Sequence, residues 1–407
     1  MVALIAVATL TPGSPERLEP TDLTCLVCGS AGGADVIRNI LLFLPLGVAT
    51  ALLGWRWPRA LATGILLSLF VESMQYFVVV GRDPSLSDLL TNSTGTALGY
   101  LLAVSAPWWI LPTPTAARRI LVAGTVVWAA FLGLTAVGLQ WDAPPLPYQM
   151  TELPPRFAGV REYEGVVHER NFDGAPPTDA DAGAAVAAAI QSGNFHLGAV
   201  VGPMYPPGLL RPLVAFYRPD WSNALLFGQQ RRNLVLSVRT RAERARLQGP
   251  GWVLHDVFPD LAESGTAEVQ AQRITLAATV DGSTVELSAS RGGQLYTATL
   301  HRRLSLGWTF ILPAFALLYR MGALLGALWL AAPLLPLGYW TRRAVAEGAG
   351  WREHVIVAAR VGATVSAVLL IVSAAGGLAA PSTLEWAALV AAALLGWALG
   401  ALTTRPS

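Results

Sequence analysis

The sequence of 407 residues lacks lysine entirely, since all 28 of its basic residues are arginine. Charged residues of every kind make up only 13% of the chain, whereas soluble domains carry about 25%. The missing lysine excludes lysine nucleophiles, Schiff bases and P-loop lysines. The net charge is only +2, which leaves no broad basic face, so we predict no nucleic acid partner.

Apolar residues are correspondingly abundant. Hydrophobic residues make up 53% of the chain, and the mean hydropathy is +0.49. A helix needs about 20 mostly apolar residues to cross a bilayer, and seven segments are long enough. They are Val36–Trp55, Ala60–Val80, Asp88–Leu111, Ile120–Leu139, a segment within Pro313–Trp340, His354–Leu378 and Glu385–Leu402. Arg320, Pro333 and Pro336 predict an interfacial piece, a kink, or both in the fifth.

A block from Gln140 to Leu306 interrupts these segments. It holds 16 of the 26 acidic residues and 15 of the 28 arginines, so it is soluble in character. We therefore expect a transmembrane bundle (1–140), an inserted globular domain (141–306) and three further transmembrane helices (307–407). Before the first span, Val2–Leu10 is apolar but only half a span long. We interpret it as the truncated end of a helix, with a short signal-like anchor as the alternative.

Arginines in short loops predict which side of the membrane is cytoplasmic. Alternation of the spans brings the following arginines to one side: Arg56, Arg59, Arg118, Arg119, Arg342, Arg343, Arg352 and Arg405. That side should be the cytoplasmic side of the cell membrane, and the globular domain is then extracytoplasmic. Arg302 and Arg303 flank a span on the outer side and are an exception.

The chain contains only two cysteines, Cys25 and Cys28, in a C-x-x-C motif on the predicted outer side. A zinc site would need two more ligands, and the sequence has no second C-x-x-C and no H-x-x-x-H. We predict a disulfide, because oxidised pairs persist outside the cytoplasm. Free thiols and a redox or metal role are the alternatives. No metal site and no cofactor are predicted.

The globular domain is predicted to be all-β. Five segments are short and either alternate or carry β-branched residues. They are Phe195–Val201, Leu213–Tyr217, Leu234–Thr240, Arg273–Val280 and Thr284–Ser290. Asp281 and Gly282 predict a hairpin turn, whereas Ala182–Ile190 fits either a helix or a strand. The predicted fold class is a polytopic α-helical membrane protein with an inserted β-sandwich or jelly roll.

Polar side chains recur at helical spacing inside the first three spans. Glu72 is the most demanding, because a carboxylate in hydrocarbon costs at least about 2.5 kcal/mol. The polar positions share one face of each helix: Asn39; Ser68, Glu72 and Gln75; Asp88 and Asn92. The motif Gly95-x-x-x-Gly99 lets helix backbones approach closely. Three roles are open for these side chains: structural hydrogen bonds, an outward-facing ligand site, or a proton relay. In the structural role, Arg82 could form an ion pair with Asp88 or Glu72.

The segments Asp35–Gly47, Ser68–Gln75 and Gly81–Gly95 resemble the VanZ-like membrane proteins. The resemblance covers about residues 1–140. That family is associated with tolerance of the glycopeptide teicoplanin, so the resemblance implies a cell-envelope role. Its motifs point to one candidate ligand set, namely Asn39, Glu72, Gln75, Arg82, Asp88 and Asn92.

A second resemblance lies in the globular domain. Asn194–Pro203, Leu226–Gln229 and Asn233–Thr240 are similar to concanavalin A-like lectin sandwiches. Retaining glycosidases need two carboxylates about 5–5.5 Å apart, and the E-x-D-x-E run that hydrolases of this fold carry is missing. Glu162-x-Glu164 is better explained as a solvated strand. Asp179-Ala-Asp181 hints at a calcium loop but lacks the other ligands.

Two functions follow from these patterns. The first is a non-catalytic envelope protein that binds glycan, a lipid-linked precursor or a glycopeptide antibiotic. The second is a proton-coupled transporter or lipid-handling protein that uses Glu72. Intramembrane catalysis ranks last, because the predicted spans of the bundle contain no cysteine, lysine or histidine. The lipid bilayer is a partner in every case.

Overall fold

The structure is a computed structural model. It describes residues 5, 25–27, 29–79, 85–145, 147–150, 162–174, 182–202, 204, 208–217, 223–259, 272–312, 321–346 and 348–403. Within these residues, six helical segments are long and apolar enough to cross a membrane. Two antiparallel sheets are inserted between the third and the fourth. The predicted fold class is therefore confirmed.

The first helices are α2 (Gly32–Leu52), α3 (Trp57–Phe77), α4 (Leu86–Val104) and the short α5 (Ala106–Ile110). The predicted single span Asp88–Leu111 is wrong, because the helix breaks at Ser105 before the proline in the first turn of α5. Proline lacks an N–H and clashes with the preceding turn, which ends a helix. Moreover, α4 is not among the six apolar spans, since its first half is rich in Ser, Thr and Asn.

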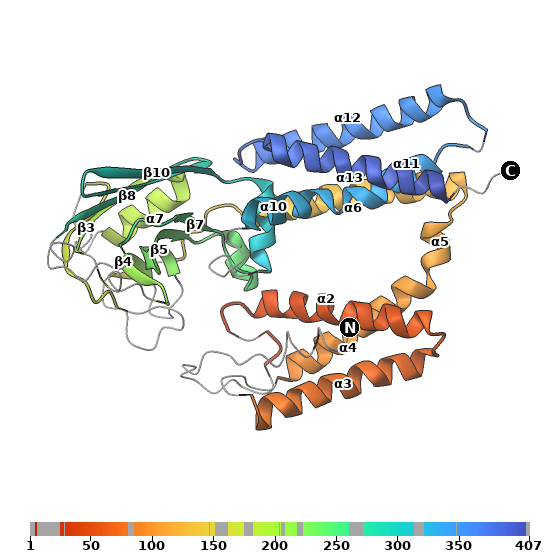
Figure 1. Cartoon of the computed structure of the whole chain (residues 1–407), viewed down its shortest axis with the longest axis horizontal. Coiled ribbons are helices and arrows are strands. Elements are labelled where there is room, and N and C mark those ends of the chain that lie inside the picture. The colour runs from red at the N-terminus through yellow and green to blue at the C-terminus, as the bar shows by residue number, and fades with distance from the viewer. Residues whose placement is uncertain are drawn as a thin grey trace.

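The remaining helices are α6 (Pro114–Gly138), α10 (Gly322–Ala331), α11 (Leu334–Arg343), α12 (Trp351–Ala375) and α13 (Thr383–Leu402). A break between α10 and α11 falls at Ala332 and Pro333, as the sequence predicts, while Pro336 lies inside α11. Figure 1 shows the β region beyond one end of these helices, while the α2–α3 and α11–α12 connections lie at the opposite end.

Glycine allows the closest helix contacts, as the G-x-x-x-G motifs predict. A Cβ on Gly99 would collide with the carbonyl oxygen of Leu44, so α4 and α2 meet backbone to backbone. A Cβ on Gly396 would likewise collide with the carbonyl oxygen of Leu335, which joins α13 to α11. Such approach brings short polar side chains on neighbouring helices within reach of each other.

The inserted region is a sandwich of two five-stranded antiparallel sheets, in the orders β1-β4-β5-β6-β7 and β10-β9-β8-β3-β2. The strands are β1 (Gln149–Met150), β2 (Val167–Phe172), β3 (Asn194–Val201), β4 (Arg211–Tyr217), β5 (Asn223–Gln230), β6 (Asn233–Val238), β7 (Gly251–Leu254), β8 (Ile274–Asp281), β9 (Thr284–Arg291) and β10 (Gln294–His301). All five predicted strands are confirmed, as is the hairpin turn at Gly282, where φ is +57°. The ambiguous segment is a helix, α7 (Ala182–Ser192).

A single core joins the two sheets. Phe172 of β2 stacks on Phe195 of β3 and meets Phe216 of the opposite sheet edge-on. In β8 and β9 buried and more exposed residues alternate, as expected for a sheet with one solvated face. Strands β4 to β7 are instead buried along nearly their whole length. The second sheet therefore provides the solvent-exposed face of the sandwich.

Candidate functional site

The polar residues predicted in the first three spans lie on facing sides of α2, α3 and α4. We call them the polar cluster: Asn39, Ser68, Glu72, Gln75, Asp88 and Asn92. Ser68, Asn92, Gln75 and Glu72 are all buried, with exposed fractions of 0%, 2%, 4% and 9%. Their burial follows from the close α2–α4 contact and from the packing of Gly64 of α3 against α4.

Two side-chain hydrogen bonds cross between helices within this cluster. The Asn39 amide donates from Nδ2 to Oδ1 of Asp88 at 2.7 Å, which joins α2 to α4. The Asn92 amide donates from Nδ2 to Oγ of Ser68 at 3.0 Å, which joins α4 to α3. In an apolar environment such bonds spare polar groups the cost of burial. The cluster therefore holds the three helices together.

Glu72 has a different kind of partner. Its Oε2 accepts a hydrogen bond from the backbone N–H of Ser85 at 2.8 Å. Ser85 is the N-cap of α4, and its Oγ accepts from the N–H of Ser87. A carboxylate beside a helix N-terminus is favoured by the exposed N–H groups and the helix dipole. Glu72 thus ties α3 to the start of α4.

Some predicted site residues do not enter this geometry. Arg82 and Cys28 lie outside the described residues, as do Asp179 and Asp181. Cys25 is disulfide-bonded. Gln75 lies in α3 near Glu72 and belongs to the polar cluster. On this part of α2, the only ion pair between described residues joins Arg38 to Asp35.

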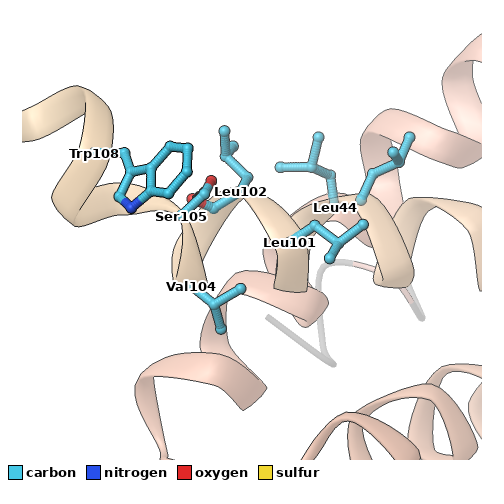
Figure 2. Close-up of a pocket in the computed structure, with 7 residues that line it drawn as sticks. Leu44, Leu101, Leu102, Val104, Ser105 and Trp108 are labelled. Atoms are coloured by element: carbon cyan, nitrogen blue, oxygen red, sulfur yellow. Dashed lines mark hydrogen bonds between the residues drawn. The ribbon is translucent and has the colours of Figure 1, made fainter. Parts of the chain in front are cut away.

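The polar cluster contributes no residue to three pockets found among the described residues. An apolar depression of about 720 Å³ lies where α4 meets α5 (Figure 2). Its lining includes Leu101, Leu102, Val104 and Trp108, and it contains none of the cluster residues. The depression is therefore an apolar surface, separate from the polar cluster.

Arg302 is a buried residue whose role the sequence did not reveal. It directly follows β10 and is only 5% exposed. Its Nη1 donates to the carbonyl oxygen of Leu139 at 3.1 Å and its Nη2 to that of Gly377 at 3.0 Å. The guanidinium also lies 4.4 Å from the ring centre of Trp141. Burial lowers the pKa of Arg302 to about 10.

Leu139 directly follows α6 and Gly377 lies two residues after α12, beside helix ends whose last carbonyls carry partial negative charge. A cation placed there is favoured. The arginine predicted as an exception to the charge rule therefore docks the β region onto two helix ends.

A second docking contact joins the β region to α2. The carbonyl oxygen of Arg246 accepts from the N–H groups of Gly33 at 2.9 Å and Ala34 at 3.3 Å, in the first turn of α2. A Cβ on Gly33 would collide with the carbonyl oxygen of Ala245. The 3-10 helix η1 (Arg241–Ala245) thus caps the helix that carries Asn39.

An ion-pair network supports η1. Asp142 receives hydrogen bonds from Arg244 and Arg239, with its Oδ1 2.5 Å from Nη2 of Arg244. Burial alone would raise the pKa of Asp142, but the bonds from the two arginines outweigh it and lower the pKa. Glu243 accepts from the N–H of Thr240 in a capping box. Burial raises the pKa of Glu243 to about 7, against the opposing effect of Arg239.

The described part of the chain defines a multi-span membrane protein with an inserted two-sheet antiparallel β region. The model of the VanZ/LLP1 family matches residues 8–110, about a quarter of the chain. The predicted VanZ resemblance is confirmed for this segment, which contains every residue of the polar cluster. Comparisons with curated proteins and with solved structures found no match.

Proposed function

We propose that this protein is a non-catalytic component of the bacterial cell envelope. Its helices hold an extracytoplasmic β-sandwich against the outer face of the cytoplasmic membrane. The observation that carries the proposal is the docking of the β region at the helix ends opposite the arginine-bearing connections (Figure 1). Arginine-rich short loops favour the cytoplasmic side, which puts the sandwich outside.

The exposed face of the second sheet is the surface that supports ligand binding. His196, Thr279, Glu286 and Thr299 are in register across β3, β8, β9 and β10. The Nδ1 of His196 lies 3.0 Å from Oγ1 of Thr279. A row of hydroxyl, imidazole and carboxylate groups suits the hydroxyls of a glycan, whether free, in a lipid-linked precursor or in a glycopeptide antibiotic.

The test uses the full chain purified in detergent on an array of glycans and peptidoglycan fragments. We expect binding to at least one glycan, weakened by His196→Ala. The matched control is His255→Ala, which removes an exposed histidine after β7. Absence of binding to any sugar would contradict the proposal and leave the β region a structural role.

A specific observation supports one second function, proton-coupled transport through Glu72. Its carboxylate is 9% exposed within an apolar span. The hydrogen bond from the Ser85 N–H favours a capping role instead, because it fixes the carboxylate at a helix start. A deletion strain complemented with Glu72→Gln distinguishes the two. The amide oxygen of the glutamine preserves the cap, so we expect the complemented strain to show wild-type tolerance to glycopeptides of differing lipophilicity. If Glu72 carried protons in a transporter, the same strain would lose its tolerance.

A further inference from the structure

The three C-terminal helices form an apolar groove that is separate from the polar cluster. It has a volume of about 370 Å³ and lies between α11, α12 and α13. Nearly all its lining is apolar, and Trp386 and Trp397 of α13 stand near its two ends. The buried residues of α12 are Val365, Leu369 and Ser373, all in its second half. The first half of α12 therefore stands away from α11 and α13 and leaves the groove open.

The groove is as long as one leaflet of a bilayer is thick. Trp386 and Trp397 are eleven residues apart on one helix, which corresponds to about 16 Å at a rise of about 1.5 Å per residue. The hydrocarbon core is about 30 Å thick, so a single leaflet is about half of that. The groove thus has the length and polarity of an acyl chain in one leaflet.

Basic groups gather at the Trp397 end of the groove. The guanidinium of Arg342 lies 5.7 Å from the Trp397 ring, and the His354 ring is 6.4 Å from it. Nη1 of Arg342 lies 3.3 Å from Nε2 of His354. Nε of Arg342 is buried and has no hydrogen-bond partner among the described residues. Glu353, the acid in the first turn of α12, forms no ion pair with Arg342 in the described part of the chain.

We propose that this groove binds one anionic phospholipid, with an acyl chain between α11, α12 and α13 and the phosphate at Arg342 and His354. Basic pockets at the cytoplasmic ends of membrane helices suit anionic head groups. The Arg342 guanidinium, which has no carboxylate partner among the described residues, supplies the charge. The site is independent of the proposed glycan face, which lies at the other end of the helices (Figure 1).

The test measures lipid retention by the full chain in detergent. The protein is mixed with equal amounts of phosphatidylglycerol and phosphatidylcholine, and bound lipids are counted by native mass spectrometry. We expect one phosphatidylglycerol to be retained in preference. Arg342→Gln should weaken its binding about fivefold and leave phosphatidylcholine unchanged, since one cation near a head group contributes about that factor. The control Arg119→Gln removes an exposed arginine at the same end of the helices.

The groove itself is tested by filling it. Gly362 lines the cavity, and a Cβ there meets no atom within 4 Å, so Gly362→Leu should displace the chain without a backbone clash. The matched control is Gly133→Leu in α6, where a Cβ also meets nothing within 4 Å. Ser366→Leu, on the same lining, replaces Gly362→Leu if that protein does not fold.

Equal retention of the two lipids by the wild type would overturn the proposal. So would unchanged retention in a folded Gly362→Leu protein, or an Arg342→Gln protein that matches Arg119→Gln. Inorganic phosphate alone should raise the thermal midpoint less than phosphatidylglycerol does. An equal rise would show a simple anion site and would also overturn it.

Discussion

Replacement of Arg302 by methionine is the sharpest structural prediction, because one side chain joins the β region to two helix ends. Met fills a similar volume but removes the donors to the carbonyls of Leu139 and Gly377. Hydrogen bonds from a charged donor contribute about 1.5–3 kcal/mol each, and a desolvated cation–π contact about 2 kcal/mol.

The burial of the charge opposes these gains. Burial lowers the Arg302 pKa from its ordinary value to about 10, which corresponds to about 3 kcal/mol of desolvation. The net contribution is then about 3 kcal/mol, so Arg302→Met should lower the free energy of unfolding by that amount. Arg302→Lys should lose less, since an ammonium keeps its charge near both helix ends.

The assay is the thermal midpoint of the full chain in detergent, followed by circular dichroism. The matched control is Arg303→Met, because Arg303 makes only one side-chain hydrogen bond to the described residues, from Nε to the carbonyl oxygen of Ala380 at 3.1 Å. We expect a fall of several degrees for Arg302→Met and a smaller one for the control. Equal midpoints for the two variants would refute the docking role of Arg302.

Three further predictions concern the docking contact and the polar cluster. Gly33→Ala should lower the thermal midpoint, because its Cβ collides with a carbonyl of η1. The control Gly133→Ala should leave the midpoint unchanged, and equal midpoints for the two variants would contradict this contact. In a double-mutant cycle, Asn92→Ala and Ser68→Ala should show a coupling of about 0.6 kcal/mol, and additive effects would mean that the bond contributes nothing. The raised pKa of Glu243, about 7 against an ordinary 4.5, means that the folded state holds its proton more tightly. Stability should therefore fall between pH 4.5 and pH 7, by at most about 3 kcal/mol. Glu243→Gln should remove that part of a pH titration of the midpoint, and an unchanged titration would contradict it.

Long apolar runs in the sequence predicted six of the seven expected membrane spans correctly, and alternation or β-branched residues predicted half of the strands. Periodicity also predicted that Asn39, Asp88 and Asn92 occupy helix faces that meet, because their spacing matches one helix face and the glycines allow close contact. The strands it missed include β5, whose residues are buried in an unbroken run. Such a strand has no alternation to reveal it.

Sequence patterns could not predict the long-range polar contacts. Arg302 and its two carbonyl partners are separated by 163 and 75 residues, and any residue type supplies a carbonyl. The capping of α2 by Arg246 is also a backbone contact, for which only the glycine at position 33 leaves a trace in the sequence. The choice of Ser85 as the partner of Glu72 depends on how the α3–α4 connection folds back.

We propose that the helices hold the β region outside the cell, opposite the arginine-bearing connections. Single cysteines placed in a Cys25→Ser, Cys28→Ser background test it by labelling intact cells with a membrane-impermeant maleimide. Leu295 in β10 is 69% exposed, so Leu295→Cys should react from outside. Ala346→Cys, after α11, should react only once the membrane is permeabilised. The reverse pattern, with Ala346→Cys labelled in intact cells and Leu295→Cys protected, would contradict the account.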